Sequence, residues 1–95
     1  MNSYDTLKCL FTSKIRIKLL DIFLRTSGGR FYVRELGRVL GEEAKNVSRE
    51  LKNLEALGLL KSQIQGNLKF YSVDEYFLLY PELRSIISKT TGLGW

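Results

Sequence analysis

The stretch of sequence that decides the fold is EAKNVSRELKNLEALG, which spans residues 43–58. At about 100° per residue, Val47, Leu51 and Leu54 fall within roughly 60° of one another on one side of a helix. The opposite side of that helix carries three basic side chains, which are Lys45, Arg49 and Lys52. Gly58 marks the C-terminal end, because Gly readily adopts the left-handed conformation that ends helices. We therefore expect a helix over about residues 43–57, with one side in a core and the other side exposed.

A shorter helix is expected just before this one, over about residues 35–40. Apolar residues recur there at helical spacing up to Leu40, and Gly41 ends the run. Gly37 lies inside this helix, where it costs about 1 kcal/mol relative to Ala. Its presence indicates that another helix presses against this point and leaves no space for a Cβ atom. Two helices joined by a tight turn that contains Gly are typical of a helix-turn-helix, expected here over about residues 33–58.

Two β-prone segments follow the helices, at residues 59–65 and 68–73. They are separated by Gly66 and Asn67, and a two-residue connection of this kind predicts an antiparallel hairpin with a turn of a primed type. Side chains alternate between the two faces of a strand. The residues of the second strand that we expect to face the core are Tyr71 and Val73.

These elements together predict the fold class. A last helix is expected over about residues 81–91, since Pro81 suits the first position of a helix. The predicted fold is α+β, mainly α with a small antiparallel β-hairpin. It is a winged helix-turn-helix whose wing is the hairpin of residues 59–73, with an additional C-terminal helix, in a single domain over residues 1–95.

A helix is also expected near the N-terminus, over residues 13–25, with Ser13 as its N-cap. Apolar side chains occupy most of its circumference, so it needs to be covered on two sides. Two interpretations stay open: it is the central core helix of a monomer, or its second apolar side packs against another subunit. The dimer interface that the second interpretation predicts contains apolar residues of the first and last helices, which are Ile15, Leu19, Ile22, Leu83, Ile86 and Ile87.

Length and composition exclude several classes of protein. The chain has 95 residues, no His and one Cys, so it supplies neither a zinc site, nor a Ser-His-Asp site, nor an internal disulfide. We interpret Cys9 as a small buried apolar side chain. No apolar run approaches the roughly 18 residues of a membrane helix, and no signal peptide is evident. The expectation is a cytoplasmic protein that is not an enzyme, holds no metal or cofactor and does not enter a membrane.

The charge favours a nucleic-acid partner. Fifteen Lys and Arg residues against ten Asp and Glu give a net charge of +5 and a pI near 9.5. In DNA grooves, Arg bonds guanine in bidentate fashion, Asn bonds adenine and Lys neutralises phosphate. The helix of residues 43–57 supplies such donors at Lys45, Asn46, Ser48, Arg49, Lys52 and Asn53.

Two further surfaces extend this predicted interface. Arg30, Arg34 and Arg38 recur every four residues around the second helix and predict one basic ridge, of which Arg34 and Arg38 are candidate DNA contacts. The wing, residues 61–69, contributes three candidates, which are Gly66, Asn67 and Lys69.

An ordinary solvated face explains each of these surfaces as well. Glu50 and Glu55 favour that alternative, because carboxylates repel phosphate, although both lie toward the flanks of the basic side. Arg16 lies beside the apolar side of the first helix, so we expect its aliphatic stem to cover the core and do not count it as a DNA contact.

Blocks of sequence at residues 10–20, 29–36, 47–60 and 80–84 resemble the ArsR/MarR-like winged-helix transcriptional regulators. The most similar group is a small prokaryotic one, in which the domain often precedes a nucleotidyltransferase-like domain. The resemblance implies DNA binding by the third helix and the wing, and commonly a homodimer that reads two half-sites. It places Ser48 and Arg49 where the recognition helix meets DNA, and the wing tip at Gly66 and Asn67. The Cys and His ligands of the metal-sensing members are absent here.

The predicted function is therefore that of a transcriptional regulator that binds double-stranded DNA in a sequence-specific way as a homodimer. Its recognition helix, at about residues 43–57, would enter the major groove, and its wing would lie on the flanking backbone or the minor groove. The alternative is a protein-interaction module. Such a module would dock on a partner such as a nucleotidyltransferase-like chain through the apolar outer faces of the first and last helices.

Overall fold

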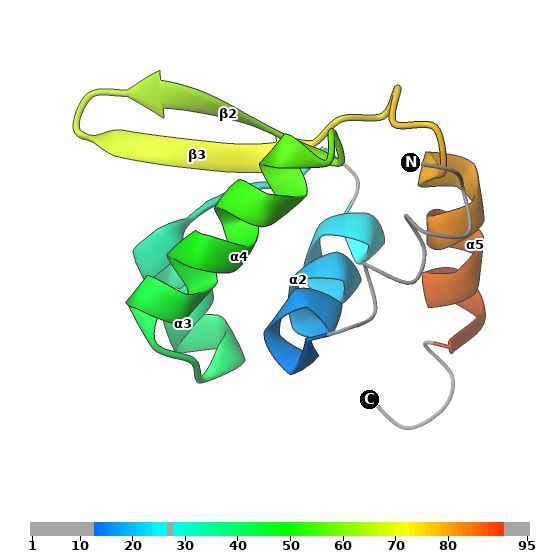
Figure 1. The fold of residues 1–95 in the computed structure, drawn as a ribbon, viewed down its shortest axis with the longest axis horizontal. Coiled ribbons are helices and arrows are strands. Elements are labelled where there is room, and N and C mark those ends of the chain that lie inside the picture. Colours follow the sequence, from blue (N-terminus) through cyan, green and yellow to red (C-terminus); the bar gives the residue numbers. More distant parts are fainter. Residues whose placement is uncertain (1–12, 27, 91–95) are drawn as a thin grey trace.

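The computed structural model describes residues 13–26 and 28–90, so the interpretation of Cys9 falls outside the described residues. The order of elements is α2 (Lys14–Arg25), β1 (Arg30–Tyr32), α3 (Val33–Leu40), α4 (Ala44–Ala56), β2 (Leu60–Gln65), β3 (Leu68–Val73) and α5 (Tyr80–Thr90) (Figure 1). Helices α3 and α4 form the helix-turn-helix and the hairpin of β2 and β3 forms the wing. The predicted α+β winged helix-turn-helix with an additional C-terminal helix is confirmed. None of the described helices is long and apolar enough to cross a membrane.

Local capping explains where the first two described helices begin and end. Ser13 is the N-cap of α2, as predicted, and its Oγ accepts a hydrogen bond from the backbone N–H of Arg16 at 3.3 Å. Helix α3 begins at Val33, two residues before the predicted start. There the backbone N–H of Tyr32 donates to Glu35 Oε1 at 3.4 Å and stabilises an earlier first turn. Gly41 ends α3 with a φ of 67°.

The sheet has three strands in the order β1-β3-β2, one more than the predicted hairpin. Strand β1 pairs antiparallel with β3, so that Phe31 lies opposite Tyr71. At the wing tip, Gly66 has a φ of 61°, whereas no described residue other than Gly has a positive φ. A positive φ at the first central residue alone is typical of a type II′ turn, so the prediction of a primed turn is confirmed.

The core lies where α2, α3 and α4 meet the inner face of the sheet. Val47, Leu51 and Leu54 of α4 are each 0% exposed, as the spacing of the sequence predicted. Tyr71 is buried on the inner face of β3 and Val73 packs against the same core. These contacts fix the rotation of α4 about its own axis, and therefore decide which of its side chains face outward.

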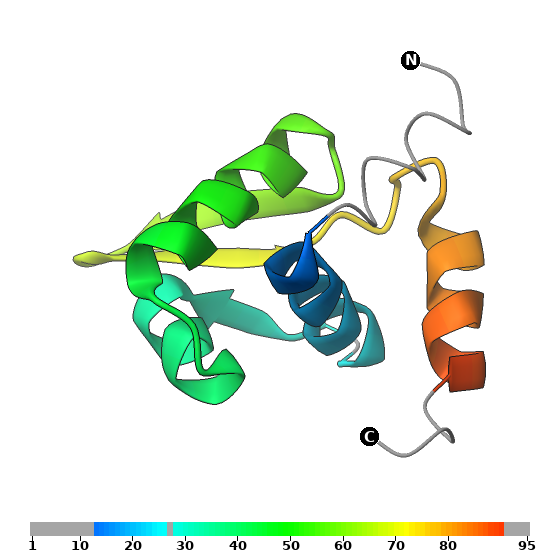
Figure 2. The same cartoon turned by 60° about the horizontal axis from the view of Figure 1, so that its bottom comes forward.

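Helix α5 covers the second apolar side of α2 within the same subunit, and α2 lies between α4 and α5 in both ribbon views (Figures 1 and 2). This packing corrects the predicted dimer interface. Leu19 is 0%, Leu83 1% and Ile87 8% exposed, so these side chains belong to the core of the subunit. Ile15 and Ile22 are partly buried against the same core, and Ile86 is exposed on α5.

Gly37 is confined by the turn that follows α3 and by the first residue of α4, Ala44, whose backbone N and Cα would lie 3.9 Å from a Cβ atom at Gly37. A Cβ atom at Gly37 would lie 3.1 Å from the backbone oxygen of Glu42. The backbone N–H of Glu42 in turn donates to the Gly37 carbonyl oxygen at 3.0 Å. The absence of a side chain at Gly37 therefore lets the turn fold back tightly onto α3.

Candidate nucleic-acid interface

The outward side of α4 is polar and carries three cationic side chains. Lys45, Arg49, Lys52 and Asn53 are exposed, whereas Asn46 and Ser48 are half-buried beside them. The apolar residues on the opposite side anchor the helix in the core, so these outward side chains project from a rigid support. Arg, Asn, Ser and Lys on one helical face provide donors that match base edges and phosphates in a DNA groove.

Glu50 does not lie on this surface, although the sequence placed it at the flank of the basic side. Its side chain turns toward α2, where Glu50 Oε2 lies 2.7 Å from Arg16 Nε, and each side chain is only 9% exposed. The guanidinium group of Arg16 is therefore buried with its stem, where only the stem was expected to cover the core. Because the two charges neutralise each other inside the protein, Glu50 adds little negative potential to the outward side of α4.

Glu55 is also engaged within the protein, since it connects the end of α4 to the wing. Its Oε2 accepts a hydrogen bond from Ser62 Oγ at 2.5 Å, and its Oε1 lies 3.8 Å from Lys69 Nζ. Hydrogen bonding with Tyr71, and more weakly the charge of Glu55, raises the pKa of Lys69 above its ordinary value. Lys69 therefore stays protonated at neutral pH, and part of its charge is balanced by Glu55.

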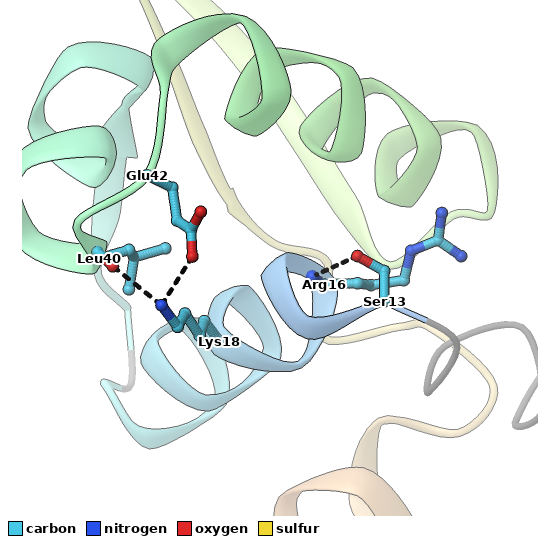
Figure 3. A network of polar contacts seen from close by, with 5 residues as sticks. All are labelled: Ser13, Arg16, Lys18, Leu40 and Glu42. Carbon is cyan, nitrogen blue, oxygen red and sulfur yellow. Dashed lines mark hydrogen bonds and ion pairs between the residues drawn. The ribbon is translucent and has the colours of Figure 1, made fainter.

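The turn between α3 and α4 is attached to α2 by a single ammonium group. Lys18 Nζ donates to the carbonyl oxygen of Leu40 at 3.1 Å and lies 2.7 Å from Glu42 Oε2 (Figure 3). This contact neutralises one of the two acidic residues that precede α4. The other, Glu43, lies 3.8 Å from Lys45 with both side chains exposed, an arrangement that contributes little to stability.

On α3 and α4, four exposed cations have no ion-pair or hydrogen-bond partner within the part of the chain that the structure describes. They lie on the two helices of the helix-turn-helix, at Arg34, Arg38, Arg49 and Lys52. The predicted ridge on α3 is thus limited to Arg34 and Arg38. Arg30 belongs to β1, where its guanidinium lies over the ring of Phe70, 4.7 Å from the ring centroid.

The wing tip contributes hydrogen-bonding groups rather than charge. Gly66 and Asn67 are exposed at the turn, and residues 62–68 contain no charged side chain. The tip of the hairpin and the N-terminal end of α4 lie toward the same end of the molecule in both ribbon views (Figures 1 and 2). A single elongated ligand at that end would meet both elements.

No candidate metal site accompanies this surface in the described ranges. No group of three or more His, Cys, Asp or Glu side chains there is arranged to hold a metal ion. Three of the carboxylates around the helix-turn-helix, Glu42, Glu50 and Glu55, are engaged in the contacts described above. The sequence alone did not reveal these contacts, because each joins residues from different elements.

Solved structures with the same fold are winged-helix proteins. The transcriptional repressor BigR from Xylella fastidiosa matches with a TM-score of 0.72 and 17% identity over 100% of this chain and 98% of BigR. The antimony-specific transcriptional repressor AntR matches with a TM-score of 0.73 and 21% identity over 95% of this chain and 75% of AntR. Apo-NmtR matches with a TM-score of 0.70 and 26% identity over 95% of this chain and 71% of NmtR.

No protein-family model matches the sequence, and no curated protein matches it either. The structural matches confirm the resemblance to ArsR-like winged-helix regulators at the level of the fold.

Proposed function

We propose that this protein is a transcriptional regulator that binds double-stranded DNA in a sequence-specific way. The observation that carries the proposal is the exposed side of α4, where Arg49 and Lys52 have no acidic partner among the described residues while Glu50 is buried against α2. A helix that is anchored by its apolar side and cationic on its outward side has the properties needed to enter a major groove. BigR and AntR, which share the fold, are transcriptional repressors.

The proposed contacts follow from the chemistry of each side chain. Arg49 would bond guanine, Asn46 and Asn53 would bond adenine, and Ser48 would bond either a base or the backbone. Cations at the edges of the interface would bind phosphates, since a compact ammonium or an exposed guanidinium positions the protein without reading sequence. These phosphate contacts are Arg34, Arg38, Lys45, Lys52 and Lys69.

The wing would complete the interface on the flanking DNA. Residues 62–68 carry no charge. At the tip, the backbone at Gly66 could come close to the minor groove, and Asn67 would provide a side-chain amide. The minor groove presents mainly hydrogen-bond acceptors at A·T pairs, which the Asn67 amide can bond.

We further propose a homodimer that presents two copies of α4 to successive major grooves, about 34 to 36 Å apart. After the correction of the interface, the apolar residues available for it are Ile15 and Ile22, which are partly exposed, and Ile86 on α5. Leu78, in the segment before α5, is 76% exposed and adds apolar area beside that helix.

The same apolar residues support one alternative function. A protein-interaction module would use Leu78 and Ile86 to dock on a partner chain, such as a nucleotidyltransferase-like protein. Light scattering together with duplex titrations separates the two proposals. A monomer with no affinity for any duplex would favour the alternative.

Duplex binding is tested by comparing two substitutions that remove one positive charge each. Arg49→Ala should weaken binding to a selected duplex by about 1 to 3 kcal/mol if Arg49 bonds a base. Lys89→Ala removes an exposed charge from α5, on the opposite side of the molecule from the wing tip, and should leave the affinity almost unchanged (Figure 1). Equal affinities of the two variants in fluorescence anisotropy titrations would contradict the proposed role of α4.

A further inference from the structure

The outer face of the sheet carries aromatic and basic side chains that have no role in the proposed duplex interface. Antiparallel register places directly opposed residues on the same face, so the pairs of β1 with β3 and of β2 with β3 define rows across the sheet. One row contains Arg30, Ser72 and Lys61. The next row contains Tyr32, Phe70 and Gln63, and beyond it Leu68 lies opposite Gln65.

Contacts between these side chains show that the neighbouring rows form one continuous surface. The rings of Tyr32 and Phe70 meet edge to face, with centroids 5.6 Å apart and an angle of 83° between their planes. The guanidinium of Arg30 lies over Phe70 at 4.7 Å from the ring centroid. Two half-buried aromatic rings and one exposed planar cation thus lie side by side.

The charged side chains of this outer face are all positive. The outward residues of the three strands include the cations Arg30 and Lys61 and no acidic side chain. The acidic residue that follows β3, Asp74, accepts a hydrogen bond from the backbone N–H of Tyr76 at 3.0 Å. The inner face differs, because there Lys69 is balanced by Glu55.

The described helices leave this face open. Helices α3 and α4 lie on the same side of the hairpin, and no described helix lies on the other side (Figure 1). The burial pattern agrees, since Leu60 and Tyr71 on the inner face are buried, whereas Lys61, Gln63 and Leu68 on the outer face are exposed.

We propose that the outer face of the sheet binds a short segment of single-stranded nucleic acid. Unpaired bases would stack on Tyr32 and on the Phe70 and Arg30 pair, while Arg30 and Lys61 would contact phosphates. The combination of a cationic surface with stacking rings selects this ligand, because the rings bind base faces and the cations bind the backbone. In a duplex the faces of the bases are stacked on one another, so duplex DNA cannot use the rings in this way.

Nuclear magnetic resonance of the isotope-labelled full chain tests the proposal with two probes, a hexamer of thymidylate and a hexamer of uridylate. Backbone amide shifts should change on the three strands at residues 30–32, 61–63 and 68–72. Either probe producing this pattern supports the proposal, and the stronger binder identifies DNA or RNA as the preferred ligand. Changes confined to α4, or no changes with either probe, would overturn it. A hexamer of glutamate that shifts these strands while neither oligonucleotide does would also overturn it.

Substitutions locate the site and separate it from the duplex interface. Tyr32→Ala should weaken oligonucleotide binding at least about fivefold, since each base that stacks on a ring contributes that much or more. Arg49→Ala should weaken duplex binding only, and Lys89→Ala should change neither affinity. With two phosphates contacted, the logarithm of the association constant should fall with the logarithm of salt concentration with a slope of about 1.4. If Arg49→Ala weakens both kinds of binding equally, α4 holds both ligands and the sheet site is refuted. The effect of Tyr32→Ala on oligonucleotide binding can be measured whether or not the protein binds a duplex, so the two proposals can fail separately.

Discussion

Replacing Glu50 by Gln tests the contact that orients α4. Glu50 and Arg16 meet at 2.7 Å, and each side chain is only 9% exposed. The Glu50→Gln side chain keeps its shape but removes the negative charge that neutralises the buried guanidinium. Breaking a buried ion pair at one partner costs about 3 to 5 kcal/mol. That is a large part of the roughly 5 to 15 kcal/mol that stabilises a typical domain.

Urea unfolding followed by circular dichroism measures this cost. Three proteins should be compared with the wild type. Glu50→Gln should lose about 3 to 5 kcal/mol, and the double variant Arg16→Met with Glu50→Leu should recover most of that loss, because apolar side chains replace both charges. Glu43→Gln, at an exposed carboxylate 3.8 Å from Lys45, should lose less than about 1 kcal/mol.

Two outcomes would refute the reasoning. One is a loss of less than about 1 kcal/mol in Glu50→Gln, which would mean that the pair is open to water. The other is a double variant as unstable as Glu50→Gln, which would mean that apolar side chains at these two positions do not compensate for the loss of the ion pair.

Three further changes have definite expected results. Lys18→Met should lower the free energy of unfolding by about 1 kcal/mol, since it removes two partly buried contacts of one ammonium group, whereas the exposed neighbour Lys14→Met should not; urea titration measures both. Gly37→Ala should destabilise the protein, because its Cβ would lie 3.1 Å from a backbone oxygen; a rise in the melting temperature would show that the turn yields and that helix propensity dominates. Since the pKa of Lys69 is raised above 10.5 in the folded protein, its contribution to stability is complete below that pH and is lost above it. The wild type should therefore lose more stability than Lys69→Met between about pH 10 and about pH 12, and parallel losses would contradict the assignment.

Local sequence signals predicted most of the helix-turn-helix and the wing. The spacing of Val47, Leu51 and Leu54 determines which side of α4 is buried, and this information lies within three turns of one helix. Gly66 and Asn67 likewise determine a hairpin turn within four residues. Elements of this kind are predictable because their hydrogen bonds and their periodicity are local.

The features that the sequence did not predict depend on contacts between distant residues. Residues 31–33 are a β-prone run, but the sequence does not show which strand pairs with it, and the three residues of β1 form a strand by pairing with the free edge of β3. Periodicity shows that the helix containing Leu19 has two apolar sides, but it does not show whether another subunit or another element of the same chain covers the second side. Here α5 covers it.

Glu50 illustrates the same difficulty at the candidate site. Arg16 and Glu50 are 34 positions apart, so their pairing is invisible to helical spacing. One signal was present: each charge lies beside the apolar side of its own helix, and opposite charges on two buried faces are candidates for a buried pair. Because Glu50 is paired with Arg16, it does not repel phosphate at the outward side of α4.

The salt dependence of duplex binding tests the central claim most directly. The claim is that exposed cations of α4 bind DNA phosphates, so each lost contact should lower the slope of the logarithm of affinity against the logarithm of salt concentration by about 0.9. Lys52→Ala should show that decrease relative to the wild type, and Lys89→Ala should keep the wild-type slope. Equal slopes for all three proteins, or binding that does not weaken as salt rises, would contradict the account.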